Sequence, residues 1–200
     1  FPNSYLAEDN RQIIIGIDVV YFVSDTYTYS DLRELVKSRK SIAEFSGLFG
    51  VFSYETIHYF EKINRKEKAE YDYPEFIFSD AGAYLHFDKK NSEFSFFGDT
   101  EKYSDLLLQL KDVASAEKSE NNKSFKILSN ESEKKNIFLK NVNEAKEYIK
   151  KGDIFQIVLS NRLAAPFEGS LLNTYRMLRT INPSPYMFYF SGTDVEVAGA

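Results

Sequence analysis

AYLHFDKKNSEFSFF, from Ala83 to Phe97, contains the pattern that decides the fold. Its hydrophobic residues recur at every second position on both sides of the polar tetrapeptide at residues 88–91. A period of two is typical of β-strands, and a short polar break between two such runs is typical of a hairpin turn. The stretch therefore predicts two antiparallel strands joined by a tight turn.

The composition excludes several functional classes. Of the 200 residues, 43% are hydrophobic and 28% are charged, and the 18 Phe and 14 Tyr predict a large aromatic core. The net charge of -5 gives no general attraction to nucleic acid or to an anionic membrane, so we expect neither partner. The absence of cysteine excludes disulfides and thiolate catalysis and fits a reducing compartment, from which we expect a cytoplasmic protein.

Local patterns predict four helices around the strands. One begins near Ser30, with Asp31 as its N-cap, and another runs from Ser104 to about Glu117. Hydrophobic residues at helical spacing predict a long amphipathic helix over residues 133–151, and a shorter helix follows Ser170.

Apolar runs predict further strands at residues 11–18, 154–159, 186–190 and 195–200. Long helices set against antiparallel strands place the chain in the α+β class. No phosphate-binding loop, nucleophile elbow or dinucleotide motif is present, and the two His residues lack metal-ligand spacing. From these residues alone, the function stays open.

Three stretches together resemble one enzyme family. They are GLFGVFSYETIHYFE at residues 47–61, KEYIKKGDIFQIVLSNR at residues 146–162, and RTINPSPYMFYF at residues 179–190. Their order and spacing are similar to those of anthranilate synthase component I, a chorismate-utilising enzyme, although His58 stands where Arg is usual. The resemblance implies an antiparallel-sheet sandwich with flanking helices. It also implies that the chain is the N-terminal portion of such an enzyme, with the sandwich incomplete.

The resemblance implies an activity for the full-length protein. Such enzymes convert chorismate and ammonia to anthranilate and pyruvate with Mg²⁺, in tryptophan biosynthesis. The ammonia comes from a glutamine amidotransferase subunit. The Mg²⁺ ligands and the catalytic His of the family are expected beyond residue 200, so we assign no metal ligand and expect this segment alone to be inactive.

Gln156 occupies a position that the resemblance makes informative. In the related isochorismate and salicylate synthases a Lys stands there and activates water. Gln cannot accept a proton, but ammonia carries a lone pair and needs no such base. Gln156 therefore favours a nitrogen nucleophile, although an ordinary polar strand residue is the alternative.

The resemblance also implies feedback regulation by tryptophan. YLAED, residues 5–9, is similar to the first half of the family's regulatory site, and Pro185, Tyr186 and Met187 match the second half. We therefore expect L-tryptophan to contact six residues, which are Leu6, Glu8, Asp9, Pro185, Tyr186 and Met187. Glu8 offers a carboxylate to the ligand's ammonium, and Tyr186 and Met187 offer polarizable surface to an indole. Ala7 and Asp9 depart from the family's Leu and Ser.

We divide the chain into an N-terminal regulatory region at residues 1–120, a polar linker at 121–131 and the start of the chorismate-utilising domain at 132–200. Two alternatives remain open. The first is aminodeoxychorismate synthase component I of the folate pathway, although the Tyr after Pro185 favours the anthranilate enzyme. The second is a non-catalytic module that senses tryptophan and docks an amidotransferase.

Overall fold

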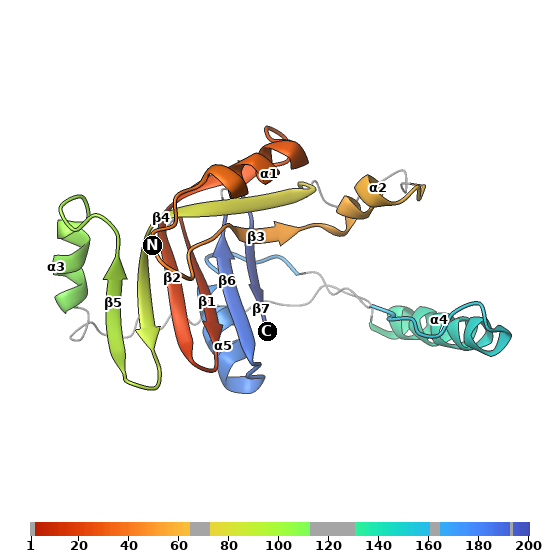
Figure 1. The fold of residues 1–200 in the computed structure, drawn as a ribbon. Coiled ribbons are helices and arrows are strands. Elements are labelled where there is room, and N and C mark those ends of the chain that lie inside the picture. Colours follow the sequence, from red (N-terminus) through yellow and green to blue (C-terminus); the bar gives the residue numbers. More distant parts are fainter. Residues whose placement is uncertain (1–2, 65–72, 113–130, 161–164, 193) are drawn as a thin grey trace. The chain divides into compact units, whose positions relative to one another are not determined.

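The structure, a computed structural model, describes residues 3–64, 73–112, 131–160, 165–192 and 194–200. By its contacts the chain divides into two compact units, residues 1–118 with 170–200, and residues 119–169. The described part of the first unit contains an antiparallel sheet with helices beside it (Figure 1). The predicted α+β fold, with an antiparallel sheet and flanking helices, is confirmed.

The described strands form one seven-stranded sheet in the order β3-β4-β2-β1-β6-β7, with β5 paired to the other end of β4. The strands are β1 (Ser4–Asp9), β2 (Gln12–Val23), β3 (Phe49–Phe52), β4 (Phe76–Asp88), β5 (Glu93–Phe97), β6 (Tyr186–Ser191) and β7 (Glu196–Gly199). β1 lies between β2 and β6, so the first and the last strands of the chain share one sheet.

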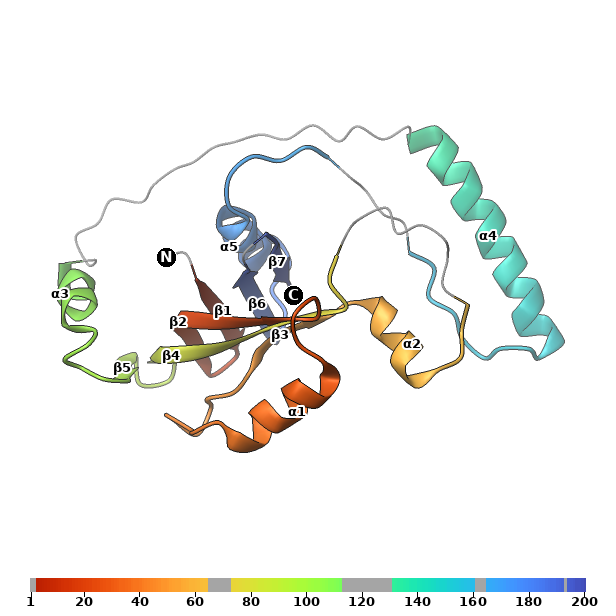
Figure 2. The ribbon, with the colours of Figure 1, turned by 90° about the horizontal axis from the view of Figure 1, so that it is seen from above.

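The helical segments of the described chain are α1 (Tyr29–Ser38), η1 (Tyr54–Thr56), α2 (Ile57–Phe60), α3 (Ser104–Asp112), α4 (Glu131–Lys151) and α5 (Leu172–Ile181). Seen from above, α1 and α5 lie on opposite sides of the sheet (Figure 2). α4 belongs to the second unit.

The predicted hairpin is confirmed as β4 and β5. The carboxylate of Asp88 accepts hydrogen bonds from the backbone N–H groups of Lys90 and Asn91, which folds the chain back. Ser92 completes the turn with a φ of 57°. Asp is favoured at such positions because its side chain can bond to backbone groups just ahead of it.

The core of the sheet is aromatic, as the composition predicted. The side chains of Tyr84, Phe76 and Phe190 are all at most 1% exposed. Tyr5 of β1 stacks on Phe49 of β3, with ring centroids 4.3 Å apart. Burying such rings supplies a large share of the apolar area that stabilises a domain of this size.

Asp31 is not the N-cap of α1, which corrects one sequence prediction. The N-cap is Thr28, whose hydroxyl accepts a hydrogen bond from the Asp31 N–H, while the Asp31 carboxylate accepts one from the Thr28 N–H. This reciprocal arrangement is a capping box that starts three residues earlier than expected. The helix itself is confirmed.

The predicted strand at residues 154–159 is wrong. Residues 152–160 have no regular secondary structure, and Phe155 is fully exposed. A strand requires a neighbour for its backbone N–H and C=O groups, and none of the described strands pairs with this stretch. An apolar run indicates one possible strand, but it does not indicate the second strand that must pair with it.

The other helix predictions hold where the structure describes them. The long helix is confirmed as α4, and the helix from Ser104 is confirmed to Asp112. The remainder of that helix and nearly all of the predicted linker at 121–131 lie outside the described residues. The predicted division at 1–120, 121–131 and 132–200 stays a prediction, while the contacts group residues 170–200 with the N-terminal region.

Gly50 in β3 is required by close backbone packing, which gives a test of the sheet edge. A Cβ at Gly50 would lie 2.1 Å from the carbonyl oxygen of Ile77 and 2.6 Å from the Cα of Phe78. We expect Gly50→Ala to lower the free energy of unfolding by about 2 kcal/mol, measured by urea denaturation, because backbone must move. Gly47→Ala is the matched control, since nothing lies within 4 Å of its Cβ position. Equal stability of the two variants would contradict this packing.

Candidate functional site

The pairing of β1 with β6 brings together two of the stretches singled out in the sequence. Glu8 lies opposite Met187, and Asp9 lies opposite Tyr186. Nearly 180 residues separate these partners along the chain, and the sheet makes them neighbours. The described structure thus places both predicted halves of the regulatory site side by side.

Successive side chains of a strand point to opposite faces, so the predicted residues divide between two sides of the sheet. Leu6 and Met187 pack with Tyr175 on the face that α5 covers. Glu8 points to the same face, because its carboxylate contacts α5. Asp9 and Tyr186 alternate with these residues and belong to the opposite face.

The carboxylate of Glu8 is held by three donors and is only 8% exposed. Lys89 Nζ lies 2.6 Å from Oε1, and the hydroxyl of Tyr175 donates to Oε2 at 2.7 Å. Arg179 bonds both oxygens, with Nη2 2.7 Å from Oε1 and Nε 2.7 Å from Oε2. Glu8 therefore joins β1 to α5 and to the turn after β4.

These contacts shift the pKa values of the Glu8 carboxyl and the Tyr175 hydroxyl. Burial would raise the pKa of the Glu8 carboxyl, but the hydrogen bonds from Lys89, Tyr175 and Arg179 outweigh it and hold that pKa below its usual range. Burial, reinforced by the neighbouring carboxylate, raises the pKa of the Tyr175 hydroxyl. Glu8 is thus ionised and Tyr175 protonated at neutral pH.

A hollow of about 220 Å³ lies beside the β1–β6 pair. Its apolar lining comes from Ala7, Ile14, Phe49 and Phe188, and Asp9, Gln12 and Tyr186 also border it. The side chain of Tyr186 is 76% exposed, so its ring is available to a bound molecule. Glu8 and Met187 also border the hollow, although their side chains face α5.

The carboxylate of Asp9 is hydrogen-bonded within the turn between β1 and β2. Its Oδ1 accepts hydrogen bonds from the backbone N–H groups of Arg11 at 2.7 Å and Gln12 at 2.9 Å. Burial would raise the pKa of this carboxyl, but these backbone bonds outweigh it and lower the value. A negative charge is therefore fixed at the rim of the hollow.

The remaining predicted site residues do not join this group. Pro185 is exposed just before β6 and does not line the hollow, and Leu6 packs beneath α5. Gln156 is exposed in the second unit, outside any strand. Its assignment to the nucleophile side stays a prediction.

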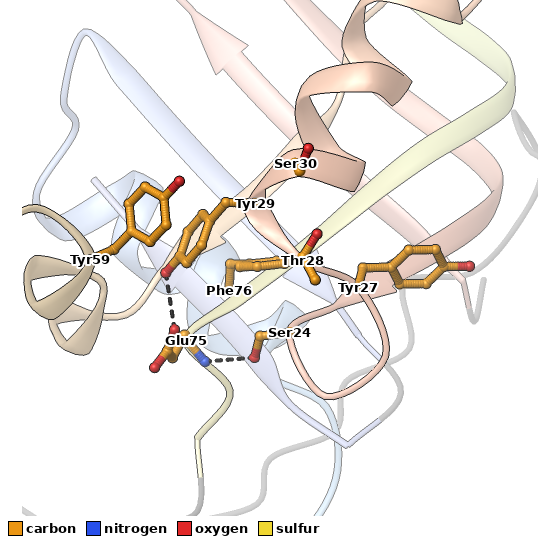
Figure 3. Close-up of a pocket in the computed structure, with 8 residues that line it drawn as sticks. All are labelled: Ser24, Tyr27, Thr28, Tyr29, Ser30, Tyr59, Glu75 and Phe76. Atoms are coloured by element: carbon orange, nitrogen blue, oxygen red, sulfur yellow. Dashed lines mark hydrogen bonds between the residues drawn. The ribbon is translucent and has the colours of Figure 1, made fainter.

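A second hollow, of about 340 Å³, lies where the end of β2, the start of α1, α2 and the start of β4 meet. Figure 3 shows aromatic side chains around it, with the Tyr29 hydroxyl directed at the Glu75 carboxylate. Tyr59 of α2 and the buried Phe76 also line it. We call it the Glu75 recess.

Sequence reasoning missed the partners of Glu8 and the whole Glu75 recess. Arg179 is part of a stretch that resembles the family, but nothing local connects it to a residue 171 positions away. Among the described residues, no three His, Cys, Asp or Glu side chains gather in a way that could hold a metal ion. Nor does the described part contain a helix long and apolar enough to cross a membrane.

Comparisons with a family model and with individual proteins point to the same enzyme family. The family model described as chorismate binding enzyme matches residues 4–200. "Anthranilate synthase component 1" of Lactococcus lactis is 30% identical over 196 residues, covering 89% of this chain and 42% of that protein. The protein of the same name from Bacillus caldotenax is 51% identical over 63 residues, which are 32% of this chain and 12% of that protein. The chain thus spans less than half the length of these relatives.

A solved structure shares the fold. The crystal structure of anthranilate synthase component I from Streptococcus pneumoniae TIGR4 matches with a TM-score of 0.66 and 24% sequence identity. The match covers 100% of this chain and 48% of that one. At this identity the likeness establishes the fold alone.

The Glu8 contacts give a second test. We expect Glu8→Gln to lower the free energy of unfolding by about 2 kcal/mol at pH 7, because two cations lose their shared carboxylate. The native pKa of Glu8 is lowered, so its stabilisation is present above the unfolded value of about 4.3 and is lost as the pH falls through the native value. The difference between wild type and variant, measured by urea denaturation, should shrink towards pH 3.

Glu34→Gln is the control for that experiment. Glu34 pairs with Lys37 on the surface of α1, where both side chains are more than 60% exposed, so we expect a loss below about 0.5 kcal/mol. A loss at Glu8 that is as small, or that does not depend on pH, would show that the three contacts do not stabilise the fold.

Proposed function

This chain belongs to the chorismate-binding enzyme family, and from that premise we propose that it is the N-terminal part of an anthranilate synthase component I. The proposed activity of the full-length protein is the conversion of chorismate and ammonia to anthranilate and pyruvate. The names of the relatives and the shared fold support this assignment. In this account the ammonia comes from glutamine through a partner amidotransferase subunit.

Mg²⁺ belongs to the proposal only for the full-length protein. Its ligands are expected beyond residue 200. We therefore expect the chain alone to form no anthranilate.

The observation that carries the proposal is the hollow beside the β1–β6 pair. It joins the stretch at residues 7–9 to the stretch at residues 186–188, as expected for a tryptophan site built from two distant motifs. Aromatic side chains and the aliphatic side chains of Ala7 and Ile14 form most of its lining, which suits an indole ring.

The directions of the side chains suggest how L-tryptophan would lie there. Because the Glu8 carboxylate bonds to α5, Asp9 is the better candidate to pair with the ligand's ammonium. Tyr186 and Phe49 offer ring faces to the indole. The charge of Asp9 disfavours a ligand carboxylate beside it, so that group would point away from the turn.

Two alternative functions for the full-length protein are also compatible with the family and the hollow. Aminodeoxychorismate synthase component I would fit the same family, and Tyr186 and Met187 after Pro185 favour the anthranilate enzyme. A module that senses tryptophan without catalysis would fit the same hollow. In an assay of the full-length protein with chorismate, the first predicts aminodeoxychorismate and the second predicts no product.

Calorimetric titration of this chain with L-tryptophan tests the regulatory part of the proposal. We expect saturable binding, with L-phenylalanine weaker because its smaller ring fills less of the hollow. Tyr186→Ala should weaken tryptophan binding about tenfold, since it removes one aromatic wall. Phe94→Ala removes an exposed ring on β5 that does not border the hollow and should leave the affinity unchanged.

Two results of this titration would contradict the proposal. If folded wild-type chain shows no tryptophan binding, or binds phenylalanine as well, the hollow is not a tryptophan site. Anthranilate fluorescence, measured with chorismate, ammonium and Mg²⁺, separately tests the expected inactivity of this chain.

A further inference from the structure

Three polar side chains, Asp9, Gln12 and His86, form a hydrogen-bonded row that begins at the rim of the hollow beside the β1–β6 pair. Asp9 and Gln12 border the hollow. Gln12 Nε2 lies 3.3 Å from Asp9 Oδ2, and Gln12 Oε1 lies 2.9 Å from His86 Nε2. The polar row therefore links a charged group of the hollow to a residue of β4 that lies 74 positions beyond Gln12 in the sequence.

The register of the sheet places the polar row on the face where the hollow opens. Gln12 of β2 lies opposite Asp88 of β4, and His86 precedes Asp88 by two residues, so Gln12 and His86 form a diagonal pair. Residues two apart in a strand share a face, and diagonal partners lie about 7 Å apart, within reach of long side chains. Ile14, which lies opposite His86, borders the hollow.

The charge of Asp9 fixes the direction of both hydrogen bonds in the polar row. The pKa of the Asp9 carboxyl is below its usual range, so at neutral pH the group is ionised and only accepts hydrogen bonds. Gln12 must therefore turn its NH₂ group to Asp9 and its carbonyl oxygen to His86. Because that carbonyl also only accepts, the hydrogen of the second bond belongs to His86 Nε2.

Aromatic neighbours hold the ring of His86 in place. Phe45 stacks on this ring, with centroids 5.0 Å apart and an interplanar angle of 19°. Phe97 meets the ring edge-on, with centroids 6.3 Å apart, and it also meets Phe45 at 5.2 Å. A ring packed against two others keeps Nε2 directed at Gln12, so the amide of Gln12 is held in one orientation.

The Asp9 carboxylate retains capacity for a ligand. Within the described chain it accepts three hydrogen bonds, from the Arg11 N–H and the Gln12 N–H at Oδ1 and from the Gln12 side chain at Oδ2. A carboxylate offers about four acceptor positions, so one position is left at Oδ2. Lys89 lies nearby, but its ammonium bonds the carbonyl oxygen of Asp9 and the carboxylate of Glu8.

We propose that Gln12 and His86 are positioning residues that hold Asp9 Oδ2 towards the hollow, so that the hollow selects aromatic ligands by their protonated amine. His86 orients the amide of Gln12, Gln12 orients the carboxylate, and the ligand's ammonium takes the remaining acceptor position. The apolar lining receives the aromatic ring. This inference rests on the proposed tryptophan site and deepens it, because the amine becomes the polar group that the site recognises.

Calorimetric titration of the whole 200-residue chain with tryptamine and with tryptophol tests this role. The two probes share the indole and the two-carbon stem, and tryptophol carries a hydroxyl in place of the ammonium. We expect the wild type to bind tryptamine about tenfold more tightly than tryptophol. Gln12→Leu and His86→Phe should each weaken tryptamine binding about fivefold and leave tryptophol binding unchanged, because Asp9 loses its orientation.

Matched variants separate positioning from general packing. His86→Phe keeps an aromatic ring against Phe45, and His86→Gln supplies an amide N–H in place of the imidazole N–H, so we expect His86→Gln to restore the preference for tryptamine. Gln109→Leu removes an exposed amide on α3, away from both described hollows, and should bind both probes as the wild type does. Circular dichroism verifies that each variant is folded, and Gln12→Leu decides the matter if His86→Phe is not.

Parallel titration with L-tryptophan distinguishes this inference from the proposed function. If the wild type binds L-tryptophan and neither Gln12→Leu nor His86→Phe lowers the preference for tryptamine over tryptophol, only the positioning role is overturned. If the wild type prefers tryptamine, loses that preference in both variants and does not bind L-tryptophan, the positioning role stands and the tryptophan site is wrong. Absence of binding by all three ligands would overturn both.

Discussion

The double pairing of β1 is the constraint on which the described fold depends. This strand bonds to β2 along one edge and to β6 along the other, so it connects the N-terminal meander to the last strands of the chain. A residue of β1 therefore contacts elements that are distant in sequence on both sides. Because the side chains of a strand alternate, β1 also connects two faces, one covered by α5 and one that borders the hollow.

Charge reinforces this pairing on the α5 side. Glu8 accepts hydrogen bonds from Tyr175 and Arg179 of α5, and Glu196 of β7 accepts one from the N–H of Leu171, the N-cap of that helix. A carboxylate near the N-terminus of the helix and an Arg in its last turn both agree with the direction of the helix dipole. α5 is thereby bonded to β7 at its start and to β1 further along the helix.

This arrangement explains why the two hollows differ in character. The one at β1 and β6 has an apolar interior with Asp9 at its rim and the Glu8 carboxylate turned towards α5, and its walls come from strands brought together across the whole chain. The Glu75 recess is built from elements that are closer in sequence, and hydrogen bonds to Ser24 and Thr56 hold the backbone of Glu75 on both sides. The walls of the two hollows therefore differ in how far apart they lie in the sequence.

The sequence predicted those elements whose formation depends mainly on residues close together along the chain. The β4–β5 hairpin followed from a period of two with Asp88 at the turn, and α4 followed from helical spacing. Such local patterns could not predict which strands pair when they lie far apart in the sequence. An apolar run predicted a strand at residues 154–159, yet a strand exists only where a partner lies alongside.

The candidate site was predictable to a similar extent. Resemblance pointed to residues 5–9 and 185–187, but it did not indicate that the Glu8 carboxylate turns away from the hollow. That direction depends on Lys89 and Arg179, which lie 81 and 171 residues from Glu8 in the sequence. Nothing in the local sequence around any of these three residues specifies the contact.

The most direct test of this account is a cross-link between β1 and β6. The chain contains no cysteine, so the double substitution Ala7→Cys with Phe188→Cys introduces the two thiols alone, at positions that lie opposite each other. The account predicts that mild oxidation joins them within one chain, detected by mass spectrometry of the digested protein, since opposite Cβ atoms of such a pair lie about 5 Å apart. Ala7→Cys with Tyr189→Cys, one position along and on the opposite face, should stay reduced. Equal cross-linking of both pairs, or of neither, would contradict the register that assembles the candidate site.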